Sequence, residues 1–224
     1  MSAPVVLVPG LGLGPKSYAR TVEHLTTPFQ IVTLPGYGEP AGPRVDLHPQ
    51  ALGAALAEKI RERSVLVGHS ASCQIVVETA VAHPELVHAL VLAGPTGDIR
   101  ASGWPDLLAR WLASALPESP RLIPALAPQY ARTTLSSIAR AVEAARHHDL
   151  AKVITGVKAP VVIVRCRHDQ LSPADWTQRL AELVHGEART FETGSHMPVL
   201  TNGPELAALI QRAAAAPGGD TRYR

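Results

Sequence analysis

A serine between small residues marks the point where an apolar run gives way to a helical stretch. Gly68-His69-Ser70-Ala71-Ser72 follows Val65-Leu66-Val67 and leads into residues 71–82. A strand that breaks sharply into a helix in this pattern places its central serine at the apex of a tight turn, with the hydroxyl exposed. Such a strained turn requires small neighbours because the backbone leaves little room. The pattern predicts Ser70 as a nucleophile, although Ser72 stands where a second glycine is usual.

Two further polar residues follow apolar runs later in the chain. Asp169 comes shortly after residues 159–164, which read as a buried strand, and His196 follows a shorter run at 189–192. The order serine, aspartate, histidine is that of one arrangement of serine hydrolases and differs from the protease-type orders. In this arrangement His196 would take the proton of Ser70, and Asp169 would orient the imidazole.

Together these three motifs resemble the α/β-hydrolase superfamily over nearly the whole chain. The resemblance implies an α/β fold with a mostly parallel six-stranded sheet, helices on both faces and a short helical cap. It also implies a serine hydrolase that needs no cofactor. Three short stretches are similar to those of a bacterial group of small hydrolases, namely Ser72-Cys73-Gln74, Ala82-His83-Pro84-Glu85 and Gly94-Pro95-Thr96.

Apolar runs alternate with stretches of helical spacing along most of the chain, which indicates a mostly parallel sheet covered on both faces. The six expected strands lie at residues 5–8, 30–34, 65–67, 89–93, 159–164 and 189–192. The expected helices lie at residues 18–25, 52–60, 71–82, 106–116, 133–153 and 204–213. A chain of 224 residues can bury one sizeable core, so one domain is the natural count.

The alternation is interrupted between residues 93 and 160. This region contains two of the three tryptophans, Trp104 and Trp111, and the second of them lies in an amphipathic stretch at 106–116. In the resemblance, an insertion here is the cap over the active site. The expected division is a core at 1–97 and 136–215, a cap at 98–135 and a flexible tail at 216–224. A short cap implies a partly open pocket with apolar and aromatic walls. Alternatively, both tryptophans only pack the cap onto the core.

A glycine-rich loop at residues 10–14 follows the first expected strand. Such a loop could begin a dinucleotide-binding fold, but Pro15 replaces the third glycine and no acidic residue ends the second strand. In the hydrolase resemblance, backbone N–H groups of Leu11 and Ala71 form the oxyanion hole. The residues expected to contact the substrate are Gly12, Trp104, Trp111 and Met197.

Several other polar residues have alternative roles. Asp98 could be the acid of the triad, since some relatives take theirs from that position, or it could cap a helix. We expect His69 to pack beside the nucleophile, and His168 either to face the substrate or to belong to a loop. His147-His148-Asp149 does not predict a metal site, because adjacent side chains on a helix point in different directions, so a solvated face is expected.

Composition excludes several classes of partner. The net charge of +2 with mixed signs indicates neither nucleic acid nor an anionic membrane as partner. Cys73 and Cys166 give no disulfide framework and are expected to be reduced. No basic leader or spanning apolar stretch is visible, so a cytoplasmic protein acting on a small molecule is expected. No feature indicates an oligomeric state.

The expected reaction is hydrolysis of a small to medium ester or lactone through an acyl-enzyme. The alternatives on the same scaffold are a thioester or a C–C bond as the substrate. Epoxide and haloalkane hydrolases carry an aspartate at the elbow, so Ser70 argues against both. From another class, the chain could be a ligand-binding, receptor-like protein with slow turnover, which the turnover number would distinguish.

Overall fold

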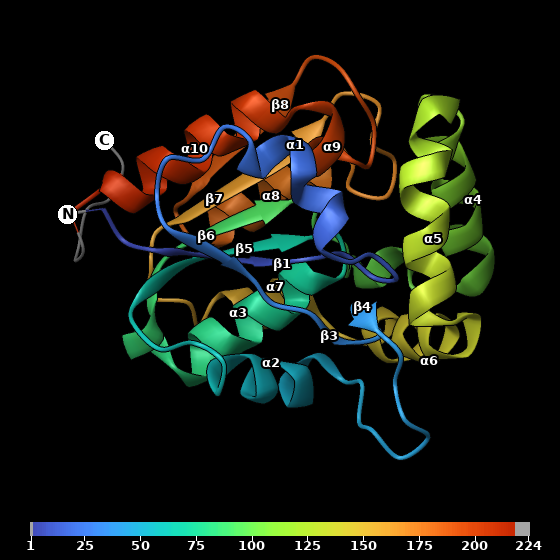
Figure 1. The fold of residues 1–224 in the computed structure, drawn as a ribbon, viewed down its shortest axis with the longest axis horizontal. Coiled ribbons are helices and arrows are strands. Elements are labelled where there is room, and N and C mark those ends of the chain that lie inside the picture. The colour runs from blue at the N-terminus through green and yellow to red at the C-terminus, as the bar shows by residue number, and fades with distance from the viewer. Residues whose placement is uncertain (1, 218–224) are drawn as a thin grey trace.

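A single parallel sheet forms the centre of the protein. The structure, a computed structural model, describes residues 2–217 (Figure 1). Six strands pair in parallel in the order β2-β1-β5-β6-β7-β8. Their bounds are β1 Val5–Val8, β2 Phe29–Ile31, β5 Ser64–His69, β6 Val87–Ala93, β7 Val161–Cys166 and β8 Glu187–Phe191. The mostly parallel six-stranded sheet expected from the sequence is therefore confirmed.

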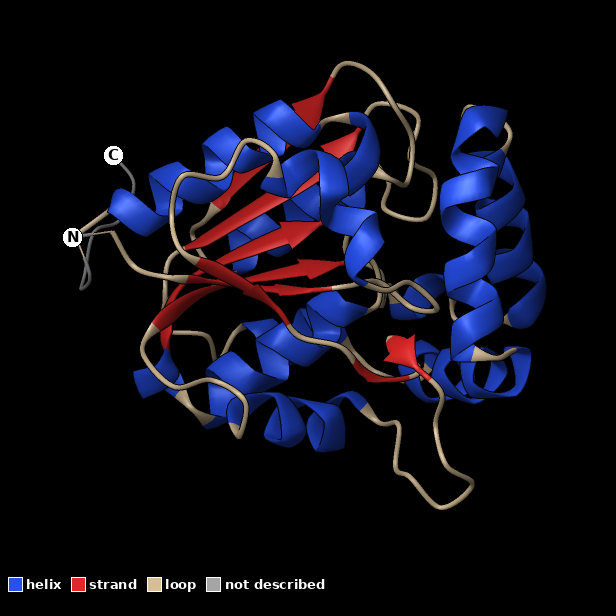
Figure 2. Ribbon diagram, viewed as in Figure 1, coloured by secondary structure: helices blue, strands red, loops and turns tan. Residues whose placement is uncertain are grey.

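Helices cover both faces of this sheet, because alternate residues of each buried strand point to opposite sides (Figure 2). Val6 and Val8 belong to one core cluster, and Val5 and Leu7 belong to the other. The first cluster includes residues of α2 (Pro49–Ala57), α3 (Ser72–Ala82), α7 (Leu150–Ile154) and α8 (Ala174–Leu183). The second includes residues of α1 (Ala19–Val22), α9 (Pro198–Thr201) and α10 (Gly203–Ala215).

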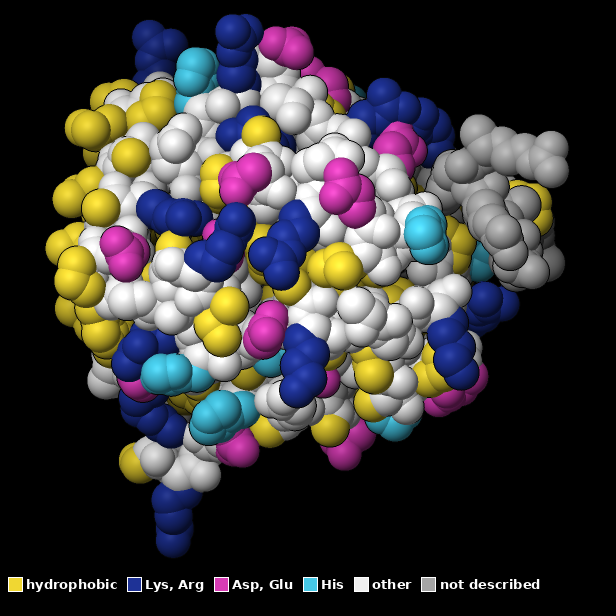
Figure 3. Space-filling model, turned by 180° about the vertical axis from the view of Figure 1, so that it is seen from behind, with side chains coloured by type: hydrophobic (Ala, Val, Ile, Leu, Met, Phe, Trp, Pro, Cys, Tyr) yellow, Lys and Arg dark blue, Asp and Glu magenta, His cyan; other side chains and the backbone are white. Residues whose placement is uncertain are grey.

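Three further helices stand beyond the ends toward which the strand arrows point (Figure 1). They are α4 (Trp104–Ala115), α5 (Ile123–Thr133) and α6 (Leu135–Arg146). Several apolar side chains of α4 are half exposed, and hydrophobic side chains gather along this side of the molecule (Figure 3). Because α6 lies with α4 and α5, we propose that the cap continues past residue 135 to residue 146.

The structure differs from the expected elements in several places. Its helices α5 and α8 have no counterpart among the expected helices. The second strand ends at Ile31, and the chain then forms β3 (Leu34–Pro35) and β4 (Gly38–Glu39), which make a separate two-stranded sheet. The expected helix at 133–153 is divided into α6 and α7, because Asp149 caps the second helix by accepting the Lys152 N–H.

Some sequence expectations concern the chain as a whole. Cys73 and Cys166 are both buried and unpaired with each other, which agrees with reduced cysteines. Within residues 2–217, no helix combines the length and the apolar composition needed to cross a membrane. Of the expected tail at 216–224, residues 218–224 lie outside the described residues.

Candidate active site

The turn between β5 and α3 places Ser70 in a strained backbone conformation. Its φ is +57°, in the left-handed region that costs a residue other than glycine about 1–2 kcal/mol. The Ser70 N–H donates to the carbonyl of Ala93 at 2.9 Å, which holds the turn against β6. A Cβ at Gly68 would lie 2.8 Å from backbone atoms of Cys73, so only glycine fits there. The turn therefore presents the Ser70 hydroxyl at the end of the central strand.

Ser72 fills the position where a glycine was expected, and its hydroxyl has a clear structural role. The side chain is fully buried, and its Oγ accepts the His69 N–H at 2.8 Å. The same hydroxyl lies 2.9 Å from the carbonyl oxygens of Val8 and of His69, to either of which it can donate. Because Val8 ends β1, this serine ties the first loop of the chain to the nucleophile turn.

The three residues singled out in the sequence form one hydrogen-bonded chain. The Nε2 atom of His196 lies 2.8 Å from the Oγ of Ser70. The Nδ1 atom of His196 lies 2.9 Å from Oδ2 and 3.0 Å from Oδ1 of Asp169. The residues follow the ends of β5, β7 and β8, and the carboxyl ends of parallel strands meet at one edge of a sheet. A base therefore lies within proton-transfer distance of the serine.

The electrostatic surroundings of His196 favour its protonated form. Burial acts to lower its pKa, but the charge and hydrogen bond of Asp169, with a smaller contribution from Glu118, raise the pKa above its ordinary value. Asp169 itself is fully buried, and its Oδ1 also accepts the Ser172 N–H at 2.9 Å. The carboxylate is thus oriented by the protein, in a position that favours a protonated imidazole at His196.

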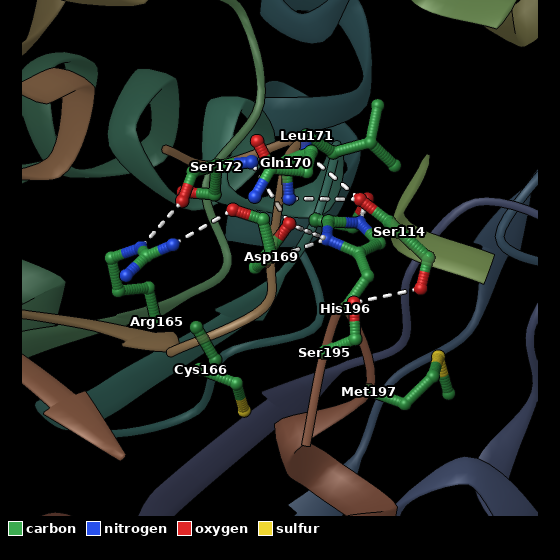
Figure 4. Close-up of polar contacts among 12 residues, drawn as sticks. Ser114, Arg165, Cys166, Asp169, Gln170, Leu171, Ser172, Ser195, His196 and Met197 are labelled. Atoms are coloured by element: carbon green, nitrogen blue, oxygen red, sulfur yellow. Dashed lines mark hydrogen bonds and ion pairs between the residues drawn. The ribbon is translucent and has the colours of Figure 1, made fainter. Parts of the chain in front are cut away.

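Arg165, a residue that the sequence reading did not single out, holds the loop that carries Asp169 (Figure 4). Its buried guanidinium donates to the carbonyls of Ser172 and Asp169, both at 2.8 Å, and to that of Arg167 at 3.2 Å. Charge-assisted hydrogen bonds of this kind are stronger than neutral ones. An arginine near the end of a buried strand, just before the acid, is the sequence signal that could have identified it.

Gly94 makes room for the acid and the base. Its φ is +59°, and a Cβ on this residue would lie 3.1 Å from Oδ2 of Asp169 and 3.4 Å from the His196 ring. The Gly94 N–H also donates to the carbonyl of Val164 at 2.7 Å. Any larger residue at this position would therefore press directly on the hydrogen bond between Asp169 and His196.

Two backbone N–H groups near Ser70 are available to an oxygen atom. Leu11 and Ala71 both line the cavity beside the serine, and no hydrogen bond within residues 2–217 engages the N–H of either. Neighbouring bonds fix the first loop, since the Gly12 N–H donates to the Gly36 carbonyl and the Leu13 N–H to that of Gly10, each at 2.9 Å. Free N–H groups held in this way suit an oxyanion hole.

A cavity of about 830 Å³ opens above Ser70 and His196, between the sheet edge and the helices α4 and α6. Its walls are mainly apolar, and those apolar residues include Trp104, Leu108, Trp111, Leu135, Ile138 and Met197. Three of the four expected substrate contacts thus line it. Gly12, the fourth, is not among the lining residues, and the Tyr130 ring lies 2.5 Å from a Cβ placed on it.

Comparison with known proteins identifies the family. The model of the alpha/beta hydrolase family matches residues 5–209. The chain belongs to this α/β-hydrolase family. It is similar to a pimeloyl-[acyl-carrier protein] methyl ester esterase of Methylococcus capsulatus, with 26% identity over 92% of each chain.

Solved structures of other α/β hydrolases share the fold of this hydrolase. A hydrolase from Oleispira antarctica matches with a TM-score of 0.79 and 15% identity, over 94% of this chain and 92% of the other. An esterase from Exiguobacterium antarcticum matches with a TM-score of 0.77 and 15% identity, over 96% and 94%. The family match and the similarity to the esterase, and not these structures, show that the chain is an enzyme of the hydrolase class.

Asp98, the alternative acid, has other partners in this hydrolase. Its carboxylate accepts hydrogen bonds from the Arg100 side chain at 2.8 and 2.9 Å and lies 3.6 Å from Arg110. Burial acts to raise the pKa of Asp98, but the hydrogen bonds and charge of these arginines hold it below its ordinary value. Asp98 also accepts the Arg100 N–H at a helix start, so the structure favours the capping role.

His69 packs beside the base. The centroids of the His69 and His196 rings lie 5.5 Å apart, and the His69 Nε2 lies 2.8 Å from the His196 carbonyl oxygen. Burial, followed by the charge of His196, lowers the pKa of His69 to about 4. A neutral His69 donates its Nε2–H to that carbonyl, and it supports the loop of the base without exchanging protons.

The remaining histidines are distributed differently from the expectation. His168 is exposed and does not line the cavity, so it belongs to the loop. His147 is exposed, but the solvated face expected for His148 is wrong, because its Nε2 lies 2.6 Å from the Glu78 carboxylate in a buried pair. The reason is that α6 ends at Arg146, so helical spacing no longer applies. Among the described residues, no group of metal-binding side chains is present.

Proposed function

We propose that this hydrolase cleaves a small to medium carboxylic ester or lactone through an acyl-enzyme on Ser70. The observation that carries the proposal is the chain from Ser70 through His196 to Asp169 at the base of an apolar cavity. No cofactor is needed for this chemistry, because the nucleophile, the base and the oxyanion donors all come from the chain.

The mechanism follows from these atoms. His196 Nε2 takes the Ser70 proton as Oγ attacks the carbonyl carbon, and the Leu11 and Ala71 N–H groups stabilise the oxyanion. Each such donor contributes about 10²–10³ in rate. The intermediate collapses by breaking the C–O bond, and His196 returns the proton to the departing alcohol. Water, activated by the same histidine, then releases the acid and restores Ser70.

The cavity indicates the kind of group that flanks the scissile bond. Its volume of about 830 Å³ lies within the range of small-molecule sites, and apolar and aromatic side chains dominate its walls. Burial of each methylene group there contributes about 0.8 kcal/mol. We therefore propose that the substrate carries an apolar chain of intermediate length. Thioesters and C–C bonds remain the alternative substrates.

A methyl ester at the end of a longer chain is the second candidate. The relative from Methylococcus capsulatus, whose name specifies a pimeloyl-[acyl-carrier protein] methyl ester, is similar over 92% of this chain. The apolar cavity beside Ser70 can hold a run of methylene groups, which favours the same class of substrate here.

The cytoplasmic location expected from the sequence remains a prediction.

The test is the initial rate on a panel of substrates, with Ser70→Ala as the blank. The panel contains p-nitrophenyl esters of two to twelve carbons, simple lactones, thioesters, a vinylogous diketone and methyl esters of long-chain acids. We expect rapid turnover that falls by about 10⁴–10⁶ in Ser70→Ala or His196→Ala. Both variants should unfold within a few degrees of the wild type.

The outcome separates the alternatives. An optimum at intermediate chain length supports the ester proposal, whereas a preference for methyl esters over p-nitrophenyl esters of the same acid supports the second candidate. Retention of most turnover in Ser70→Ala would refute the nucleophile. Stoichiometric acylation of Ser70 without further turnover would favour the receptor-like alternative.

A further inference from the structure

The end of the cap helix α4 lies against the two loops that carry Asp169 and His196 (Figure 4). Most of α4 is exposed or half-buried, and within this helix only Ser114 is buried. A lone buried hydroxyl in such a helix must find hydrogen-bond partners, because an unsatisfied buried polar group is costly. Those partners lie on the core of the hydrolase and not on the cap.

Ser114 makes hydrogen bonds with both loops. Its Oγ accepts the N–H groups of Gln170 at 2.9 Å and of Leu171 at 3.0 Å, the two residues that follow Asp169. Its carbonyl oxygen accepts the hydroxyl of Ser195 at 2.7 Å, the residue before His196. The last carbonyls of a helix have no partner within it, so this one is free to bind another segment.

Glu118, just after α4, adds a contact on the other side of His196. Its Oε1 accepts the Met197 N–H at 3.1 Å. Ser195 and Met197 flank the base, so the segment that carries His196 is held at both of its neighbours. The Ser195 hydroxyl also lies 3.0 Å from the His168 carbonyl, which links this segment to the residue before Asp169.

We propose that Ser114 and Glu118 are positioning residues, through which the cap holds the Asp169 and His196 segments in register with Ser70. The proposal rests on the function proposed above, because it assigns a role in that reaction. Neither residue touches the reacting atoms. Instead, Ser114 and Glu118 bind four residues adjacent to the acid and the base, three through their N–H groups and Ser195 through its hydroxyl. A displacement of the end of α4 would therefore displace both segments.

A purely structural role would have different consequences. If α4 were only a wall of the cavity, weakening its contacts would alter substrate binding and stability, and the serine would keep its reactivity. If it positions the triad, the rate of the chemical step must fall even with saturating substrate. Misplacement of a catalytic group by about 1 Å can cost roughly 10²-fold in rate.

The first experiment compares Ser114→Ala with Ser136→Ala, an exposed serine of α6 whose hydroxyl lies 3.3 Å from that of Thr134. For Ser114→Ala we expect kcat to fall by about tenfold to a hundredfold with a smaller change in KM. The rate of Ser70 labelling by a fluorophosphonate should fall in parallel. Ser136→Ala should match the wild type in all three quantities.

The second experiment uses Glu118→Gln, which keeps an oxygen acceptor for the Met197 N–H, and Glu118→Ala, which does not. The ionisable groups that face His196 are Asp169, Glu118 and His69. Removal of one carboxylate charge should therefore move the acidic limb of the pH profile to lower pH in both variants. Only Glu118→Ala should also lose kcat.

The two experiments test the roles of Ser114 and Glu118 separately. Wild-type kcat and labelling rate in Ser114→Ala, or a change in KM alone, would overturn the role of Ser114. An unmoved acidic limb and an unchanged kcat in both Glu118 variants would overturn that of Glu118. An unreactive wild-type Ser70 would instead refute the proposed function. The low-field NMR signal of the His196 Nδ1–H then still tests the positioning, since Ser114→Ala should broaden or shift it.

Discussion

Replacement of Gly94 by alanine is a direct test of how tightly the acid and base are packed. The added Cβ would lie 3.1 Å from Oδ2 of Asp169 and 3.4 Å from the ring of His196. The separation from Oδ2 is shorter than ordinary van der Waals contact, and that from the ring is at its lower limit, so the Asp169 side chain must move by a few tenths of an ångström. These are the atoms nearest to the new methyl group, so the perturbation falls first on the hydrogen bond behind Ser70.

The expected magnitudes follow from this geometry. At a φ of +59°, alanine costs about 1–2 kcal/mol relative to glycine, and the stiffer unfolded chain offsets about 0.4–1 kcal/mol of that. The free energy of unfolding should therefore fall by about 1 kcal/mol, or roughly 2–4 °C in Tm. A shift of a few tenths of an ångström at the acid should lower kcat/KM by about tenfold, since about 1 Å costs roughly 10²-fold.

The assay is kcat/KM on the best ester of the panel, measured beside urea unfolding, with Gly53→Ala as the control. Gly53 lies in α2, and its added Cβ would lie 3.0 Å from the Cβ of Glu78, away from the acid and base. The control adds a comparably tight contact elsewhere in the protein and should keep its activity. Wild-type kcat/KM in Gly94→Ala would refute the claim that this glycine sets the packing of Asp169 and His196.

Three further predictions follow from the site. Because the pKa of His196 is raised, the acidic limb of kcat/KM should lie above the ordinary histidine value of about 6.5, and a midpoint below it would contradict this. Asp169→Asn should lower kcat by roughly 10⁴-fold while Asp98→Asn stays within about tenfold, and steady-state kinetics with the reverse order would exchange their roles. Ser72→Ala leaves the buried His69 N–H without its acceptor, so unfolding in urea should show a loss of about 1–3 kcal/mol, whereas an unchanged midpoint would mean that the turn relaxes at no cost.

The fold and the residues at the strand ends could be predicted because their signals are local. Ser70 is preceded by an apolar strand and followed by a helix within one short motif. Asp169 and His196 each follow a strand of their own, and parallel strands bring such ends to one edge. Once the strands are known to be parallel, the sequence alone therefore predicts that these three side chains lie close together.

The features that could not be predicted depend on contacts between distant segments. Ser114 and Ser195 are 81 positions apart, and a serine inside an amphipathic helix gives no sign of its partner. A helix that runs unbroken from residue 133 to residue 153 predicts a solvated face for His148. The chain instead turns there, and His148 enters a buried pair with Glu78. In both cases the tertiary partner decides the environment, and local spacing does not.

The strand order has a consequence for the growing polypeptide. Ser70 is synthesised 126 residues before His196, which follows β8 at the edge of the sheet. Chains emerge from the ribosome N-terminus first, so the turn that carries Ser70 can form before His196 has been synthesised. Until β8 pairs with β7, Ser70 is an ordinary alcohol. The return of Ser70-dependent hydrolysis during refolding would therefore report that β8 has paired with β7.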